Sequence, residues 1–165
     1  MPNVTALGLS SIEVAAANAK ATDSTWAALG KTYEDTCKMT EDDPTEQDFY
    51  AEEEDDPQES IVKRGKTVIA WSIMNLTAAT AEKVFGGRYD ETSKTWGSPK
   101  KIFIEERAIK ITPEIGCTFI VPRAKFYAKI TADFSKKGLF LAECKATILA
   151  PSDTTRSRIE IVDPA

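Results

Sequence analysis

The clearest pattern along the chain is a pair of segments in which apolar and polar residues alternate. In residues 126–134 every second side chain is apolar, and residues 139–149 repeat this pattern after a Lys-Lys-Gly sequence. A period of two is typical of a strand with one buried face, and two such runs joined by a short turn predict a hairpin. We therefore predict an antiparallel pair here, with Cys144 on its inward-facing side.

Two segments near the middle of the chain also have the character of strands. Residues 66–74 form a continuous apolar run rich in β-branched and aromatic side chains, which predicts a strand buried on both faces. Residues 31–40 alternate, although Asp35 interrupts the apolar side. Residues 60–64 are a further candidate strand, closed by Gly65.

The C-terminal half carries three more strand-like segments. Residues 101–112 alternate with a slip at residues 105–107, which a β-bulge would explain. Residues 117–121 favour a strand up to Pro122, and residues 156–162 favour a last short strand.

One helix is predicted, directly after the central apolar run. Asn75 or Thr77 can cap its N-terminus, residues 76–85 carry an apolar stripe, and a Gly-Gly pair ends it. A helix of about ten residues needs tertiary packing to persist. A turn-rich stretch follows over residues 88–99.

These elements predict a mostly β (α+β) chain: an antiparallel β-sandwich or small barrel of about seven to eight strands, with one short helix packed at its edge. The length fits a single domain, residues 1–165. Residues 1–20 are small and polar and are interpreted as a flexible N-terminal arm, within which residues 12–16 can form a strand. No apolar run approaches the roughly 20 residues of a membrane helix, and the start lacks a secretion signal, so we expect synthesis in the cytoplasm.

Charge is distributed very unevenly along the chain. The net charge is −5, yet residues 41–59 hold eleven acidic residues and no basic ones, which leaves 21 basic and 15 acidic residues, a net +6, elsewhere. Pro44 and Pro57 bound this segment, and the aromatic pair between them favours a long hairpin or extended loop over pure coil. The candidate contact residues of this long acidic loop or hairpin are Glu41, Asp42, Asp43, Glu46, Asp48, Phe49, Tyr50, Glu52, Glu53, Glu54, Asp55 and Asp56.

Catalytic and cofactor chemistry finds little support in the composition. The chain has no histidine, which excludes Ser-His-Asp and Cys-His catalysis and removes the commonest transition-metal ligand. Its three cysteines, Cys37, Cys117 and Cys144, are widely separated, so buried thiols are expected in place of a disulfide framework or a zinc site. No phosphate-binding glycine motif occurs. We expect no catalytic residue, no metal site and no cofactor.

Two groups of acidic residues were candidates for other chemistry. An EF-hand requires a glycine at the sixth position of its loop, and no glycine occurs between Gly30 and Gly65, so a solvated acidic loop is favoured over a calcium site. Glu105 and Glu106 are neighbours on a predicted strand, so their side chains point to opposite faces and cannot act on one substrate. An enzyme based on paired carboxylates is therefore the least favoured class.

A recognisable order of features extends along the chain. A small-residue arm leads to Trp26 and to residues 29–32 (Leu-Gly-Lys-Thr), and a strand then enters a long charged loop. Residues 65–68 (Gly-Lys-Thr-Val) open a buried strand, a short helix ends at Gly-Gly, and strands follow to the end. This order resembles the major tail tube proteins of long-tailed phages and the related contractile-tail and type VI secretion tube proteins. The similarity covers nearly the whole chain.

The resemblance implies a structural role. Proteins of this family form a β-sandwich or barrel whose sheets join side by side in a hexameric ring, and the rings stack into a hollow tube that passes DNA. The long loop between the second and third strands reaches toward the neighbouring ring, and residues 40–58 correspond to it. The implied partners are copies of the same chain and other tail proteins, with DNA contacted without specificity and no membrane. The implied location is the virion tail, after synthesis in a bacterial host.

The charge pattern then has two interpretations. In the first, the acidic loop of one ring docks on basic residues of the next, where complementary charge sets register and association rate. In the second, some acidic residues face the lumen and keep DNA from adhering.

Other classes stay open from the sequence. A tail terminator or baseplate component of related fold would form closed rings that do not polymerise. A monomeric β-sandwich that binds carbohydrate or peptide would need exposed aromatics on one face, and the candidates are Tyr89, Trp96, Phe49 and Tyr50.

Overall fold

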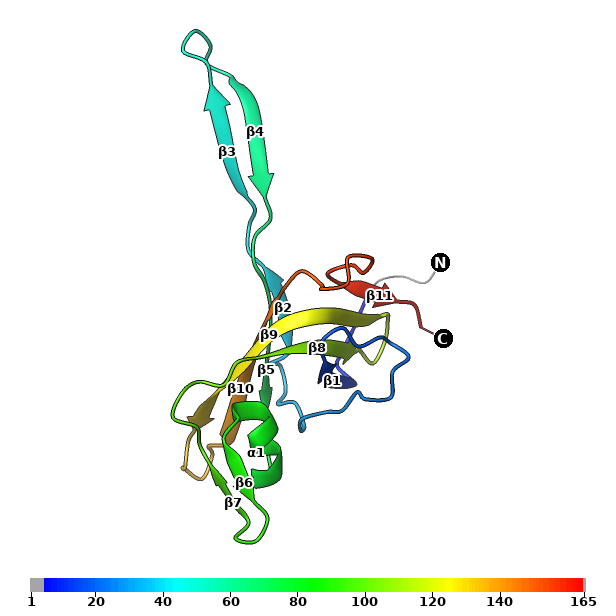
Figure 1. Ribbon diagram of the computed structural model, residues 1–165, viewed down its shortest axis with the longest axis vertical. Helices are drawn as coiled ribbons and strands as arrows, with labels where there is room; N and C mark the ends of the chain where they lie inside the picture. Colours follow the sequence, from blue (N-terminus) through cyan, green and yellow to red (C-terminus); the bar gives the residue numbers. More distant parts are fainter. Residues whose placement is uncertain (1–4, 165) are drawn as a thin grey trace.

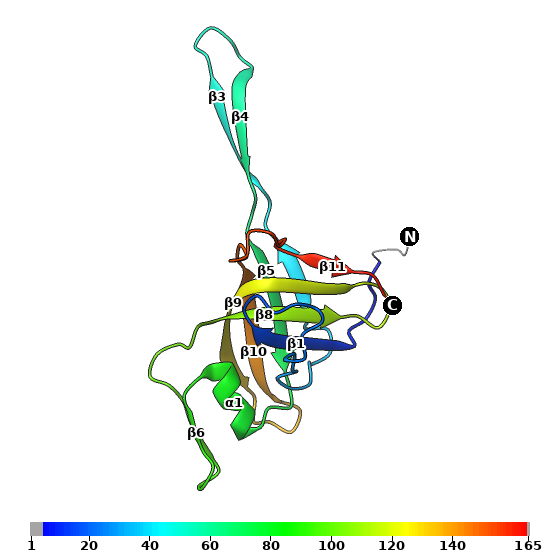
Figure 2. The same ribbon diagram turned by 45° about the vertical axis from the view of Figure 1, so that its right-hand side comes forward.

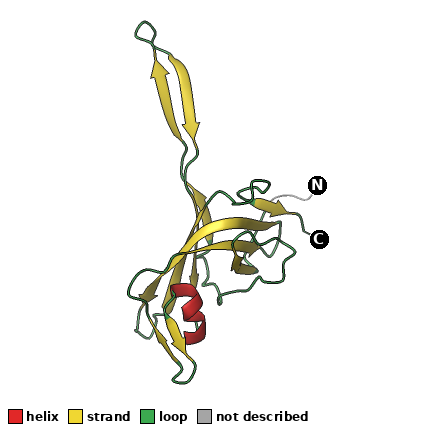
Figure 3. Ribbon diagram, in the orientation of Figure 1, coloured by secondary structure: helices red, strands yellow, loops and turns green. Residues whose placement is uncertain are grey.

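The computed structural model describes residues 5–164, and nearly all of its regular elements are strands (Figures 1 and 3). The first four residues of the predicted N-terminal arm lie outside the described residues. No helix within the described chain is long and apolar enough to cross a membrane. In chain order the elements are β1 (Ser11–Ala16), β2 (Lys38–Glu41), β3 (Thr45–Tyr50), β4 (Pro57–Lys63), β5 (Thr67–Ile73), α1 (Ala78–Phe85), β6 (Arg88–Asp90), β7 (Thr95–Gly97), β8 (Glu105–Thr112), β9 (Thr118–Ala132), β10 (Phe140–Ile148) and β11 (Glu160–Val162).

Seven of these strands form one twisted antiparallel sheet. The strand order is β1-β8-β9-β10-β5-β2, and β11 pairs with the N-terminal part of β9. The mostly β, antiparallel fold with one short helix is therefore confirmed. No pairing between described residues joins β1 to β2, so the sheet is open and sandwich-like, and the alternative of a closed small barrel is wrong.

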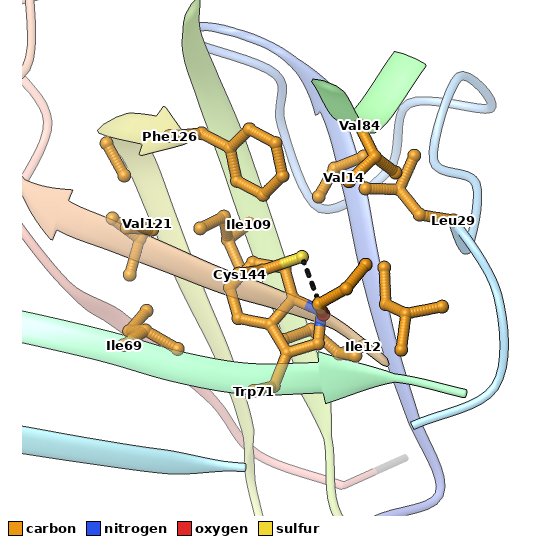
Figure 4. Packing of buried hydrophobic residues seen from close by; sticks show 14 of the residues in the cluster. Ile12, Val14, Leu29, Ile69, Trp71, Val84, Ile109, Val121, Phe126 and Cys144 are labelled. Atoms are coloured by element: carbon orange, nitrogen blue, oxygen red, sulfur yellow. Dashed lines mark hydrogen bonds between the residues drawn. The ribbon is translucent and has the colours of Figure 1, made fainter. Parts of the chain in front are cut away.

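The main apolar cluster of the core lies between the sheet and helix α1 (Figure 4), and a smaller one forms around Ala15, Ala19 and Ala108. Trp71 of β5 and Phe126 of β9 lie at its centre, with ring centroids 5.7 Å apart. Full burial of each large side chain of this kind contributes about 1.5–3 kcal/mol. The large side chains that are almost completely buried in this cluster include Ile69, Ile73, Val84, Ile109, Val121 and Phe126.

The hairpin of β9 and β10 is confirmed in position and inward side. Cys144 pairs with Ala128, and the alternate residues from Ala142 to Ile148 are buried. The apolar alternation nevertheless continues beyond the core. Ile130 is 49% exposed and Phe140, predicted to face inward, is 39% exposed, because the strands extend past the elements that cover the rest of this face.

Helix α1 ends at Phe85 as predicted but begins at Ala78, two residues later than predicted, with the second of the two candidate caps. Thr77 is its N-cap and accepts a hydrogen bond from the backbone N–H of Thr80 (3.2 Å). Phe85 faces the core, and Trp96 of β7 packs on it with ring centroids 5.6 Å apart. Gly86 follows the helix at φ 74°, and a Cβ there would lie 2.6 Å from a neighbouring aromatic side chain, so only glycine fits.

Strand β9 runs through Pro122, where the sequence predicted a strand end. Pro122 and Arg123 together lie opposite the single residue Ala108, and the register shifts between Arg107 and Ile109. This is a β-bulge next to the predicted slip in β8, and a bulge tolerates a residue that donates no N–H. Two predicted strands are consequently one long strand.

The strand predicted over residues 31–40 is interrupted. Tyr33 donates its N–H to the carbonyl of Ser72 (2.8 Å), and the chain then turns away at Asp35, which has a φ of 60°. The Thr36 hydroxyl accepts the N–H of Ser72 (3.1 Å) and so replaces a backbone partner. The chain pairs with β5 again only in β2.

Strands β1 and β5 change two further expectations. Within the predicted arm, β1 pairs with β8 along its whole length and buries Ile12 and Val14, so this part of the arm belongs to the folded domain. In β5, Ile69 and Trp71 are buried while Ala70 is exposed. The prediction that this strand is buried on both faces is therefore wrong at Ala70, although Ser72 on the same face is buried.

Three other segments have different bounds from those predicted. β8 begins at Glu105, four residues later than expected, and β11 covers only the last part of the predicted strand over residues 156–162. The turn-rich stretch of residues 88–99 contains a small hairpin, β6–β7. This hairpin places Trp96 against the helix, where its indole N–H donates to the Gly86 carbonyl (2.8 Å).

Candidate functional site

The acidic segment forms a two-stranded hairpin that projects away from the rest of the molecule (Figures 1 and 2). Strands β3 and β4 pair with each other and with no other described strand. Every residue in them is exposed. We call residues 45–63 the acidic hairpin; it contains eight acidic residues and one lysine.

The two faces of the acidic hairpin both carry apolar side chains. Residues alternate between faces along a strand, so Phe49 and Ile61 lie on one face and Tyr50 and Val62 on the other, as the pairing register places them. Their exposed fractions run from 46% for Phe49 to 61% for Tyr50. A hairpin of two strands is at best marginally stable alone in water. The chain by itself therefore leaves apolar side chains exposed on both faces of this hairpin.

The tip of the acidic hairpin concentrates negative charge. Residues 52–56 are five consecutive acidic residues and are all exposed. Further down, the Asp48 carboxylate accepts a hydrogen bond from the Ser60 hydroxyl across the two strands. Among the described residues, the one ion pair made by the eleven acidic residues of the segment joins Glu41 to Arg64 (3.7 Å), at the base. The tip is thus uncompensated charge.

The base of the acidic hairpin is held where its two legs meet the main sheet. The Asp42 N–H donates to the carbonyl of Lys66 (2.9 Å), which extends the pairing of β2 with β5. A Cβ on Gly65 would lie 2.1 Å from the Asp42 carbonyl oxygen, so the legs approach too closely for any other residue. Glycine at this position therefore allows the two legs to leave the sheet side by side.

The candidate contact residues lie together on this one projection. Glu41 ends β2, Asp42 and Asp43 form part of the base, and the remaining nine lie on β3 or at the tip. Of the two predicted alternatives, a long hairpin or an extended loop, the structure has the hairpin. Ile61 and Val62 were not among the predicted site residues, although they lie in the strand predicted over residues 60–64, which is part of β4.

A separate hollow of about 860 Å³ lies between the N-terminal segment and the loop before β2. Cys37 lines it, and partial burial raises the pKa of this thiol, so the reactive thiolate is disfavoured. Glu105 and Glu106 are engaged separately, with Arg107 and with Arg123. No group of three or more metal-ligating side chains is found in residues 5–164.

Comparisons with models of known protein families and with curated proteins found no match for this chain.

Proposed function

We propose that the chain is a structural subunit whose copies form hexameric rings that stack into a hollow tube, as in the tails of long-tailed phages. The observation that carries the proposal is the acidic hairpin, which projects from the domain with apolar side chains on both faces and a charged tip. In this proposal the hairpin contacts the next ring, and DNA passes through the lumen without specific contacts.

Exposed apolar side chains on the acidic hairpin support an assembly role. Phe49, Tyr50, Ile61 and Val62 are each between 46% and 61% exposed. Large apolar side chains left exposed on a projecting element are candidates for a protein–protein contact. A partner that covers one face of the hairpin would supply the second packed layer that an isolated two-stranded hairpin lacks.

Lateral contact in a ring is supported by the edge strand β2. The Asp42 N–H faces β5, so the N–H and C=O groups of Met39 and Glu41, at alternating positions, point away from β5. These groups have no backbone partner among the hydrogen bonds of the described chain. An edge of this kind pairs readily with a strand of another copy.

The negative charge of the acidic tip also supports the proposed passage of DNA. Any carboxylates that line the lumen would repel the phosphate backbone and keep transit free of adhesion. The acidic residues divide between the lumen and the neighbouring ring in this proposal. The chain acts in the virion tail after assembly in the host cytoplasm, with copies of itself and other tail proteins as partners.

A clean deletion of the acidic hairpin tests the proposal. Removing residues 44–64 joins Asp43 to Gly65, and because Asp42 already bonds to Lys66, the new Asp-Gly pair makes a two-residue turn between β2 and β5. Asp-Gly is a favoured sequence for such turns. We expect the variant to fold and to form no tubes under conditions where the wild-type chain does.

Negative-stain electron microscopy across protein concentrations provides the measurement, with circular dichroism as the check on folding. Tubes of normal length from the deletion variant would contradict the role of the hairpin. Wild-type rings that never stack would favour a terminator or baseplate component. A wild-type chain that stays monomeric at high concentration and at every salt concentration would contradict the proposed function.

A further inference from the structure

The end of the molecule opposite the acidic hairpin carries a second exposed apolar surface. It comprises the loop before β8 and the ends of β9 and β10, next to helix α1 (Figures 1 and 2). Phe134, in the turn between β9 and β10, is 93% exposed, which is extreme for a side chain of this size. We call this surface the end patch; its apolar residues are Ile102, Ile104, Ile130, Phe134, Leu139 and Phe140.

The end patch exists because the inward side of the sheet extends beyond the core. Ile130 and Phe140 lie on the same side as the buried Cys144, by the alternation of β9 and β10. A groove of about 230 Å³ runs between this strand end and the loop before β8, and Ile102 and Ile130 both line it. The patch therefore combines an uncovered part of a sheet face, at Ile130 and Phe140, with exposed apolar residues of the adjoining loops and a groove between them.

Positive charge surrounds the end patch. Residues 76–104 and 129–140, which build this end, contain eight basic and four acidic residues, a net charge of +4. Four of the lysines lie in its loops and turn, are exposed, and take part in no ion pair with a described residue. These four are Lys100, Lys101, Lys136 and Lys137.

The acidic hairpin and the end patch are complementary in two independent respects. The hairpin joins exposed apolar side chains to a net charge of −7, from eight acidic residues and one lysine. The end patch joins exposed apolar side chains to positive charge. The two surfaces lie at opposite ends of the molecule's long axis (Figure 1). One chain cannot bring them together, whereas two copies arranged head to tail can.

We propose that the end patch is the docking surface for the acidic hairpin of a second copy of this chain. The inference rests on the proposed function and assigns the receiving side of the contact between rings. Phe134 is the apolar anchor, and the four lysines face the acidic tip. A contact between two different surfaces repeats without closing when the copies are related by translation along the axis. Because the acidic hairpin and the end patch lie at opposite ends of the molecule, repeated contacts of this kind extend the assembly along one axis.

Charge reversal on each surface distinguishes the proposed contact from non-specific association. One variant reverses the hairpin tip, with Glu52→Lys, Glu53→Lys and Glu54→Lys. A second reverses the end patch, with Lys100→Glu, Lys101→Glu and Lys136→Glu. Each variant alone presents like charges to its own copies, so we expect self-association to need a protein concentration at least about tenfold higher than for the wild-type chain.

An equimolar mixture of the two variants is the decisive sample. The reversed tip of one variant is complementary to the reversed patch of the other, and their unaltered surfaces also match. We expect association in the mixture to return to within about threefold of wild type at low salt, measured by sedimentation velocity and electron microscopy. A control reverses Lys125 and Lys145 to Glu on the outer face of the central strands β9 and β10, and this variant should not rescue the tip variant.

A neutral substitution tests the apolar half of the contact. Phe134→Ser removes the apolar anchor. The Phe134 side chain is almost fully exposed, so the fold is retained, and we expect association to weaken by about tenfold. Wild-type association in the patch variant and in Phe134→Ser would place the receiving surface elsewhere and overturn this inference while leaving the tube proposal standing. A wild-type chain that never associates would overturn both.

Discussion

Cys144 lies at the centre of the core, on β10, close to Trp71 (Figure 4). Its thiol contacts the Ala142 carbonyl oxygen at 3.7 Å, and only 2% of the residue is exposed. Burial raises the pKa of this thiol to about 12, and the charge of Arg107 opposes that shift. The residue therefore acts as a small apolar side chain and has no reactive role.

This burial predicts a loss of stability at alkaline pH. The unfolded thiol loses its proton near its ordinary pKa of 9.0, while the folded thiol keeps its proton up to about pH 12. Between these values the unfolded state binds fewer protons, so the free energy of unfolding falls as pH rises, by up to about 1.4 kcal/mol per pH unit for this one group.

Urea unfolding of the wild-type chain and of Cys144→Ala at several pH values measures this contribution. The alanine variant is less stable at neutral pH because it loses packing, but its stability should fall less steeply above about pH 9. The other two cysteines are unchanged and serve as the internal control. Equal slopes for the two proteins would show that Cys144 does not carry the effect.

At the scale of elements, the acidic hairpin depends on one glycine. Gly65 lies at its base, where an added Cβ would meet the Asp42 carbonyl oxygen at 2.1 Å. Backbone atoms cannot move aside as a flexible side chain can, so the two legs must separate. This separation would weaken the hydrogen bond from the Asp42 N–H to the Lys66 carbonyl first.

We therefore expect Gly65→Ala to lower the free energy of unfolding by about 1 kcal/mol or more and to speed hydrogen exchange of the Asp42 amide. Gly97→Ala is the matched control, because the nearest atom to its added Cβ is 3.9 Å away. That control should change stability by less than about 0.5 kcal/mol. Unchanged exchange at Asp42 in Gly65→Ala would contradict the role of close approach.

At the scale of the whole molecule, Arg156 joins the two ends of the chain. Its guanidinium donates to the carbonyls of Asn18 (2.8 Å) and Ala19 (3.0 Å) and forms a two-bonded ion pair with Glu160. The side chain is only 10% exposed. The hydrogen bond to Glu160 raises the pKa of Arg156, so the group stays charged. β11 is thereby held next to the segment that follows β1.

Arg156→Ala should lower the free energy of unfolding by about 2 kcal/mol, since it removes several hydrogen bonds of a partly buried charged group. Hydrogen exchange should increase in both β1 and β11. Arg158→Ala, which removes one hydrogen bond to Thr67, is the control and should cost less. An exchange increase confined to β11 would show that the two chain ends are not coupled through Arg156.

The sequence alone determined those features of the fold that depend on residues close together in the chain. Alternation placed the C-terminal part of β9, β10 and their inward residues, because side chains on a strand change face at every residue. The Thr77 cap and the Gly-Gly end predicted helix α1, because capping involves groups within a few residues of each other. The acidic segment was visible as a candidate site because its residues are contiguous in the chain.

Other features depended on contacts between distant segments. Whether Pro122 ends a strand was decided by a bulge opposite Ala108, and the strand before β2 was broken by a turn that Thr36 stabilises through Ser72. The end patch was not predictable, because its members come from two separate parts of the chain. Alternation states which side of a strand is apolar, but only the tertiary structure decides how far other elements cover that side. Ile130 and Phe140 are exposed for this reason.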